Sequence, residues 1–132
     1  MTEKFLKKII AQNQEDLRVI SALCSTAKIK QSDIKFLKEN KIFLISLKRE
    51  NKEKPSSKEK INSIIKFEFI EKSKSRNIDQ NDKKNILELL AIEAYKKENN
   101  FEIILLFSDN RIINLFCEII DCTLEDVKVT ND

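Results

Sequence analysis

The chain contains no glycine and a single proline, Pro55, and this composition limits how its backbone can turn. A left-handed backbone conformation costs little for glycine and is next most accessible to asparagine and aspartate. Every turn that needs a positive φ angle must therefore use Asn, Asp or a strained residue. Glycine-rich phosphate loops are excluded as well, so neither a Walker A loop nor a dinucleotide-binding fingerprint can be present.

The composition predicts one small soluble domain. The 132 residues are 41% hydrophobic and 36% charged, with a formal net charge of +3. A chain this short supports one hydrophobic core, so we expect a single domain over residues 1–132, with polar loops near 50–60 and 73–84. No run reaches the roughly 18 apolar residues of a membrane span, and no cleavable signal is evident. A cytoplasmic location without a membrane partner is therefore expected.

Histidine is also absent, which removes the commonest general base and a principal zinc ligand. Carboxylate chemistry is the remaining enzymatic route, and the one cluster worth weighing is Glu118, Asp121, Glu125 and Asp126. Its spacing matches no calcium-binding loop, and no acid and base can be assigned within it. We therefore expect no catalytic, cofactor-binding or metal-binding residues, no cofactor, and a function other than catalysis.

The three cysteines, Cys24, Cys117 and Cys122, cannot all pair within one chain. On one continuous strand, Cys117 and Cys122 would face opposite sides, roughly 16 Å apart, which excludes a disulfide between them. We expect reduced thiols that pack as small hydrophobic side chains. Cys24 belongs to the apolar side of a predicted helix, whereas Cys122 is predicted to be the most accessible of the three.

An amphipathic helix is predicted from about Gln14 to Cys24. Asn13 supplies an N-cap, two carboxylates follow in the first turn, and apolar residues then recur at three-and-four spacing. A first strand is predicted just before the helix, from Phe5 to Ala11. These two elements are the start of the predicted fold.

The rest of the chain alternates apolar runs with polar turns. A short strand and a hairpin are expected between residues 28 and 50, followed by three further strands, Ile61–Glu71, Phe101–Phe107 and Ile112–Ile120. Asp109-Asn110 is suited to a primed hairpin turn where glycine is lacking. Residues 85–95 combine helix-favouring composition with apolar residues on both alternating faces, and we favour a strand there. The tail from Thr123 is expected to add one last turn.

These elements predict an α+β fold of about seven strands with one early amphipathic helix. The strands are expected to form a curved antiparallel sheet or a partly closed barrel, with the helix covering one face or opening. A barrel of the pleckstrin-homology type is one form that this arrangement can take.

Charge is unevenly distributed along the chain. Residues 48–76 contain ten basic and five acidic side chains, whereas residues 102–132 contain seven acidic and two basic ones. The basic loops could form a phosphate-contacting rim beside the strand that carries Phe67 and Phe69. Those phenylalanines lie on the apolar side of their strand, so no exposed stacking surface is predicted and nucleic-acid binding is disfavoured.

Four regions, taken in order, carry a family resemblance: KKIIAQNQEDLRVISALCSTA, DIKFLKENKIFLISLKRE, FEFIEKSKSRNID followed by ILELLAIEA, and FSDNRIINLFCEIIDCTLEDV. Over most of its length the chain resembles the bacterial domain-of-unknown-function family DUF2948. The resemblance implies a small cytoplasmic bacterial protein and brings no known activity, ligand or site residue. The chain departs from that family in lacking glycine at its turns, including Asp109-Asn110. The resemblance also favours a strand over residues 85–95.

By elimination, we expect a non-catalytic protein-interaction or structural module. Apolar runs such as Ile103–Phe107 and Ile112–Ile120 could expose a face or a strand edge for an unknown protein partner or for self-association. A small ligand inside a barrel is the alternative, and nucleic-acid binding through residues 48–76 is a weaker third hypothesis.

Overall fold

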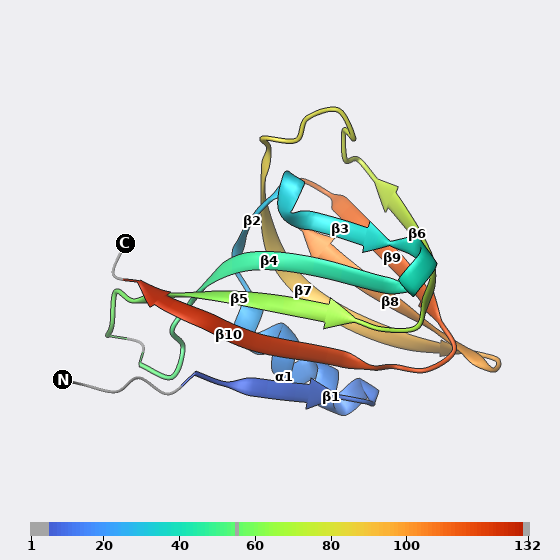
Figure 1. Ribbon diagram of the computed structural model, residues 1–132, viewed down its shortest axis with the longest axis horizontal. Helices are drawn as coiled ribbons and strands as arrows, with labels where there is room; N and C mark the ends of the chain where they lie inside the picture. Colours follow the sequence, from blue (N-terminus) through green and yellow to red (C-terminus); the bar gives the residue numbers. More distant parts are fainter. Residues whose placement is uncertain (1–5, 55, 131–132) are drawn as a thin grey trace.

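The computed structural model describes residues 6–54 and 56–130, which form ten β-strands, one α-helix and two short 3₁₀ turns (Figure 1). In chain order the elements are β1 (Lys8–Ala11), α1 (Gln14–Cys24), β2 (Lys28–Lys30), η1 (Gln31–Asp33), β3 (Ile34–Leu37), η2 (Lys38–Asn40), β4 (Ile42–Glu50), β5 (Lys60–Phe67), β6 (Ile70–Arg76), β7 (Ile86–Lys97), β8 (Asn100–Phe107), β9 (Arg111–Cys117) and β10 (Cys122–Thr130).

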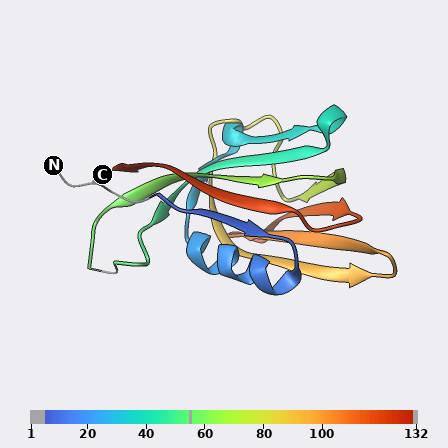
Figure 2. The same cartoon turned by 60° about the horizontal axis from the view of Figure 1, so that its bottom comes forward.

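The strands form one open, curved sheet in which neighbours run antiparallel. Its order is β1-β10-β5-β4-β2-β7-β8-β9-β6, and β3 pairs with β4 beside this path. Figures 1 and 2 show the sheet folded over on itself, with β3, β4, β5 and β10 in a first layer and β7, β8 and β9 in a second layer. The short β2 connects the two layers, because it pairs with both β4 and β7.

The hydrophobic core fills the space between the two layers. Burial alternates along β4 and β5, as expected for strands with one face against a core and the other against solvent. Side chains from α1 and from both layers form one continuous buried cluster, which includes Ile20, Ile45, Phe67, Leu89 and Leu115. These side chains occupy the interior in which the barrel hypothesis would place a ligand.

The helix is confirmed where the sequence predicts it. The Asn13 side chain accepts a hydrogen bond from the Asp16 N–H at 2.7 Å, so the expected N-cap is formed. One helical face is buried in the core and holds Leu17, Ile20 and Cys24. The three-and-four spacing of apolar residues therefore corresponds to the face that the helix buries.

The helix also satisfies the edge of β7 beyond the short β2. Ser21 Oγ accepts a hydrogen bond from the Ile92 N–H at 2.8 Å, and Gln14 Nε2 donates to the Ala94 carbonyl oxygen at 2.7 Å. Helical side chains thus replace the neighbouring strand that this part of β7 lacks. β7 extends well beyond the short β2, and the polar side chains of the helix supply the hydrogen bonds that β2 does not reach.

Positive φ angles in this chain without glycine occur at Asn and Asp, as predicted, and also at other residue types. Among the described residues, Asp109 and Asn110 have positive φ angles and form the predicted β8–β9 hairpin, and Asn77 also adopts a positive φ. Four further residues do so although they are neither Asn nor Asp: Thr26, Lys41, Phe69 and Glu98. Phe69 lies at the corner between β5 and β6.

The sheet has ten strands rather than about seven, and the prediction was wrong at two of them for physical reasons. β6 fell partly within the predicted polar loop 73–84, because an edge strand with most of its residues exposed has no apolar alternation. β10 was predicted as a last turn, because a bulge near Asp126 interrupts its alternation. Residues 86–97 form a strand, as favoured. The arrangement shows no fold of the pleckstrin-homology type, and Phe5 and Pro55 lie outside the described residues.

Candidate functional site: a lysine-lined groove

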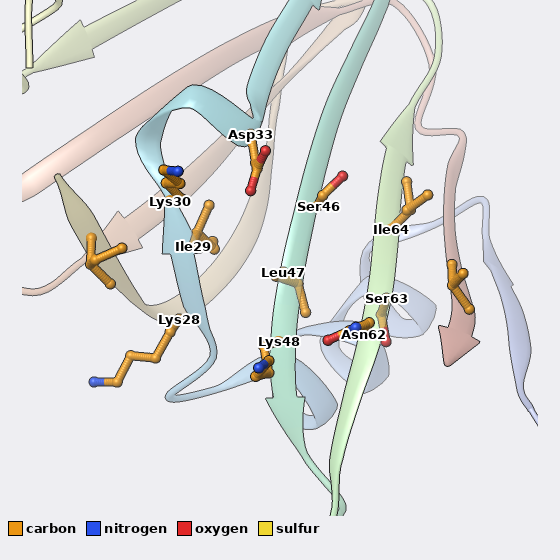
Figure 3. Close-up of a pocket in the computed structure, with 12 residues that line it drawn as sticks. Lys28, Ile29, Lys30, Asp33, Ser46, Leu47, Lys48, Asn62, Ser63 and Ile64 are labelled. Atoms are coloured by element: carbon orange, nitrogen blue, oxygen red, sulfur yellow. The ribbon is translucent and has the colours of Figure 1, made fainter. Parts of the chain in front are cut away.

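A hollow on the outer face of the first layer lies where the edge of β4 passes from one neighbouring strand to another. β4 pairs with β3 from Ile42 to Ile45 and with β2 at Lys48, and η1 spans the interval between β2 and β3. The hollow has a volume of about 530 Å³ (Figure 3). We call it the lysine groove, and its lining residues are Lys28, Ile29, Lys30, Asp33, Ser46, Leu47, Lys48, Asn62, Ser63, Ile64, Ile86 and Val127.

A row of polar side chains, three of them lysines, crosses the sheet at one end of the lysine groove. Lys28 stands directly opposite Lys48, Lys48 opposite Asn62, and Asn62 opposite Lys128. Opposing side chains have Cβ atoms roughly 5 Å apart, and like charges at that separation destabilise a sheet. Glu88 compensates one end, since its carboxylate lies 3.1 Å from Lys28 Nζ. Lys48 has no such carboxylate beside it in the part of the chain that the structure describes, so the repulsion between Lys28 and Lys48 is only partly compensated.

The lining carries more positive than negative charge. Its three lysines, Lys28, Lys30 and Lys48, stand against a single carboxylate, Asp33. Within the described residues, neither Lys30 nor Lys48 forms an ion pair or a hydrogen bond through its side chain. Figure 3 shows Lys30 and Asp33 at one end of the groove and Lys48 with Asn62 at the other. Each end of the groove thus has an ammonium group that is available to an anion.

Apolar side chains form the rest of the rim. Ile86 is 53% exposed and Val127 is 52% exposed, and Ile64 lies between β4 and β10 on the same outer face. Val127 faces the groove because the β10 register shifts between Asp126 and Lys128, which leaves it without a partner on β5. The groove therefore combines ammonium groups with exposed hydrocarbon.

The arrangement has the chemistry of a binding site for an anion. Ammonium groups, the Ser46 hydroxyl and the Asn62 amide can all donate hydrogen bonds to a carboxylate or phosphate oxygen. The lining contains no thiol and offers no partner carboxylate with which Asp33 could share acid and base roles.

A buried ion pair lies on the inner side of the sheet behind the lysine groove. The Arg49 and Asp126 side chains are 0% and 2% exposed, and Arg49 Nη2 lies 2.9 Å from Asp126 Oδ2. Arg49 Nε also donates to Asp126 Oδ1, and the Ser63 hydroxyl donates to the same oxygen at 2.7 Å. The Lys7 N–H donates to Oδ2 at 3.1 Å. Both carboxylate oxygens are therefore hydrogen-bonded, as a buried charge requires.

This ion pair holds the bulge that shapes the rim. Asp126 points inward to Arg49, and the next residue, Val127, is the unpaired one that faces the groove. The Asp126 N–H also donates to the Lys7 carbonyl oxygen at 2.9 Å, which joins the segment before β1 to the bulge. The inner ion pair thus positions one wall of the outer groove.

The four carboxylates that lie close together in the sequence are separated in the structure. Glu118 and Asp121 lie in the corner between β9 and β10, Glu125 faces outward and pairs with Lys8 at 3.7 Å, and Asp126 is buried against Arg49. Across residues 6–54 and 56–130, no three Cys, Asp or Glu side chains gather where they could hold a metal ion. The cluster in the sequence is not a cluster in space.

The cysteines are all buried and unpaired. Cys24 packs in the core, as predicted, but the prediction that Cys122 is accessible is wrong, because it points inward at the start of β10. Cys117 and Cys122 lie on different strands rather than on one. Burial raises the pKa of the Cys24 thiol to about 12 and that of Cys117 to about 11, and it raises the pKa of Cys122 well above its ordinary value.

All three thiols are therefore expected to resist alkylation in the folded protein. At neutral pH, iodoacetamide should label the native chain roughly a hundred-fold more slowly than the chain in urea, because the thiolate is scarce and the sulfur is enclosed. Mass spectrometry of timed samples gives the rate for each cysteine. Fast labelling of Cys122 in the native protein would contradict its burial.

The basic segment 48–76 does not form one surface. Arg49 is buried, Lys52 Nζ donates to the Ala22 carbonyl oxygen, and Lys72, Lys74 and Arg76 lie on β6. Figure 1 shows the β4–β5 loop and β6 at opposite ends of the molecule. The two basic stretches thus do not meet in the phosphate-contacting rim that nucleic-acid binding through residues 48–76 would need. Phe67 is buried, as predicted, whereas Phe69 is 46% exposed at the β5–β6 corner.

The chain belongs to the family described as a protein of unknown function (DUF2948), whose model matches residues 7–131. The resemblance noted in the sequence is thereby confirmed over nearly the whole chain. No curated protein and no solved structure matches the chain. Within the described part of the chain, the single helix is too short to cross a lipid bilayer.

Proposed function

We propose that the protein is a non-catalytic binding module whose lysine groove holds a small organic anion with an apolar portion. The observation that carries this proposal is the direct opposition of Lys28 and Lys48. Two lysines in one cross-strand pair reduce the stability of the sheet, and a bound anion between them would offset that repulsion.

The groove supplies a partner for each part of such a ligand. A carboxylate or phosphate would lie between Lys28 and Lys48, and Lys48 has no ion-pair partner among the described residues. Its hydrocarbon portion would cover Ile86 and Val127, which are about half exposed. The volume of about 530 Å³ is within the usual range for a small-molecule site.

We also propose that the module works in the bacterial cytoplasm. Support comes from the three unpaired thiols, because intracellular reducing conditions keep cysteines in that state. A nucleic acid is a less suitable occupant of the groove, since the apolar rim contains no aromatic side chain on which a base could stack.

Lys48→Gln is expected to weaken binding of octyl phosphate by about five-fold, because one exposed charged contact contributes up to about 1 kcal/mol. Isothermal titration calorimetry on the wild type and the variant measures the difference. The same variant should unfold with a free energy equal to or slightly above that of the wild type, since it removes the repulsion from Lys28. Reduced affinity without reduced stability separates a binding role from a structural one.

Lys72→Gln is the matched control, because Lys72 is an exposed strand lysine on β6, away from the groove. Its affinity for octyl phosphate should equal that of the wild type. Inorganic phosphate, which lacks the apolar portion, should bind at least several-fold more weakly than octyl phosphate. Equal losses in both variants, or no binding by the wild type, would refute the proposed function. Tighter binding of a single-stranded oligonucleotide than of octyl phosphate would do so as well.

A further inference from the structure

The outer edge of β6 is an unpaired strand edge on the opposite side of the fold from the β4–β5 loop. β6 stands at one end of the sheet order and pairs with β9 alone. The other end strand, β1, packs against α1, which also satisfies the edge of β7. Beyond Ile70, whose N–H donates to the Lys41 carbonyl oxygen, no backbone hydrogen bond joins β6 to a described segment other than β9. Its backbone groups are therefore open to another strand.

The edge carries a one-sided row of cations. Lys72, Lys74 and Arg76 stand opposite Phe116, Asn114 and Ile112 of β9, so their side chains share the outer face of the second layer. All three are exposed, and none forms an ion pair within the described residues. Lys74 Nζ lies 5.9 Å from the centre of the Phe116 ring, where a cation–π contact holds it over the sheet.

This charge row determines which strand the edge can accept. Antiparallel pairing of two β6 edges centred on Lys74 would bring Lys72 against the other copy's arginine and Lys74 against its own equivalent. Like charges opposite one another are unfavourable, so a second copy of this edge is a poor partner. A strand with carboxylates at alternate positions would place a negative charge against each cation.

The inner face of β6 determines which side chains an added strand could place at its other alternate positions. Ser73 and Ser75 point to the inner side of β6, and they are small. The Ser75 hydroxyl already accepts a hydrogen bond from Gln80 Nε2 at 2.9 Å, so a polar partner is not needed there. Inward-facing side chains of an added strand would lie beside Ser73 and Ser75, whereas Ile113 and Leu115 of β9 lie one strand further away and are already buried. Apolar residues suit those positions because they bring no further polar group that would need a partner.

We propose that the β6 edge binds an extended acidic segment of a partner protein by strand addition, with carboxylates and apolar residues alternating along that segment. Backbone hydrogen bonds to β6 supply affinity, and the cations at 72, 74 and 76 select the sequence. This surface is separate from the lysine groove and does not depend on the proposed anion.

A labelled synthetic peptide that alternates glutamate and valine over eight residues tests the proposal by fluorescence anisotropy, beside a matched peptide that alternates lysine and valine. The wild type should bind the glutamate peptide and bind the lysine peptide at least roughly ten-fold more weakly. The charge-reversed variant Lys72→Glu/Lys74→Glu/Arg76→Glu should exchange this preference. The single variant Lys74→Gln removes only one charge and therefore serves as a second test if the triple variant does not fold. It should weaken binding of the glutamate peptide by a few-fold.

Two further measurements locate the peptide and separate it from the groove. Amide hydrogen exchange should slow at alternate residues within 71–76 when the glutamate peptide binds, because the N–H groups that face away from β9 become paired. Lys48→Gln should leave peptide binding unchanged. Equal binding of both peptides by the wild type, an unchanged preference in the charge-reversed variant, or slowed exchange confined to β3 would each overturn the proposal.

Discussion

Asp126→Ala is expected to lower the free energy of unfolding by about 3–5 kcal/mol, because it leaves the buried Arg49 guanidinium without its main counter-charge. The carboxylate receives hydrogen bonds from Arg49, from the Ser63 hydroxyl and from the Lys7 N–H. Its removal therefore leaves several buried donors unsatisfied at once. Urea unfolding followed by circular dichroism gives the change.

Glu125→Ala is the matched control for this loss. Glu125 is the preceding residue on the same strand, but it faces solvent and pairs with Lys8 only at the surface. Its replacement should change the free energy of unfolding by less than about 0.5 kcal/mol. The double variant Arg49→Met/Asp126→Leu should recover much of the loss, since an apolar pair needs no counter-charge. A loss below 1 kcal/mol for Asp126→Ala would contradict a buried, hydrogen-bonded ion pair.

Ile20→Ala is expected to destabilise the protein by about 2–5 kcal/mol. Ile20 is fully buried on the inner face of α1, within the cluster that joins the helix to both layers of the sheet. Truncation removes buried methyl groups and leaves a cavity, and surrounding strands held by two-sided pairing have little freedom to collapse into it. The same urea experiment measures this effect.

Val19→Ala tests the assignment of the helical face. Val19 is half-exposed on the neighbouring position of the same helix. Its replacement should leave the free energy of unfolding within about 0.5 kcal/mol of the wild type, because alanine favours a helix and little apolar area is lost. Similar losses for Ile20→Ala and Val19→Ala would show that α1 does not bury the face that carries Ile20.

The helix and the β8–β9 hairpin were predictable because their signals are local. Asn13 and the apolar spacing after it are contained within one short stretch, and Asp109-Asn110 is among the few turns that a chain without glycine can use. Residues 86–97 were harder, because composition favoured a helix. The strand forms there since β8 and β2 pair with it and α1 satisfies the rest of its edge.

The missed strands and the misplaced thiol depend on distant partners. β6 has the composition of a loop and becomes a strand by pairing with β9. β10 is interrupted by a buried aspartate whose partner, Arg49, lies on β4. Cys122 was predicted to be accessible because the corner after β9 could not be seen in the sequence. In each case the deciding contact joins residues far apart in the chain.

The lysine groove could not be predicted for the same reason. Lys28 and Lys48 look like ordinary solvated lysines until the β2–β4 register places them opposite each other. The excess of basic residues over 48–76 indicated an anion-binding surface, but it indicated the loops rather than Lys48 on β4. Sequence reasoning also placed the alternative ligand inside a barrel, whereas the interior is packed and the hollow lies on the outer face.

The most direct test of the anion-binding proposal is a titration of the isotope-labelled protein with octyl phosphate, followed by amide chemical shifts. We expect saturable shifts concentrated at residues 28–30, 46–48, 62–64 and 127, which line the lysine groove. At the same ligand concentration these shifts should be smaller in Lys48→Gln. Shifts that are absent, spread evenly over surface lysines or concentrated on β6 would contradict an anion site in the groove.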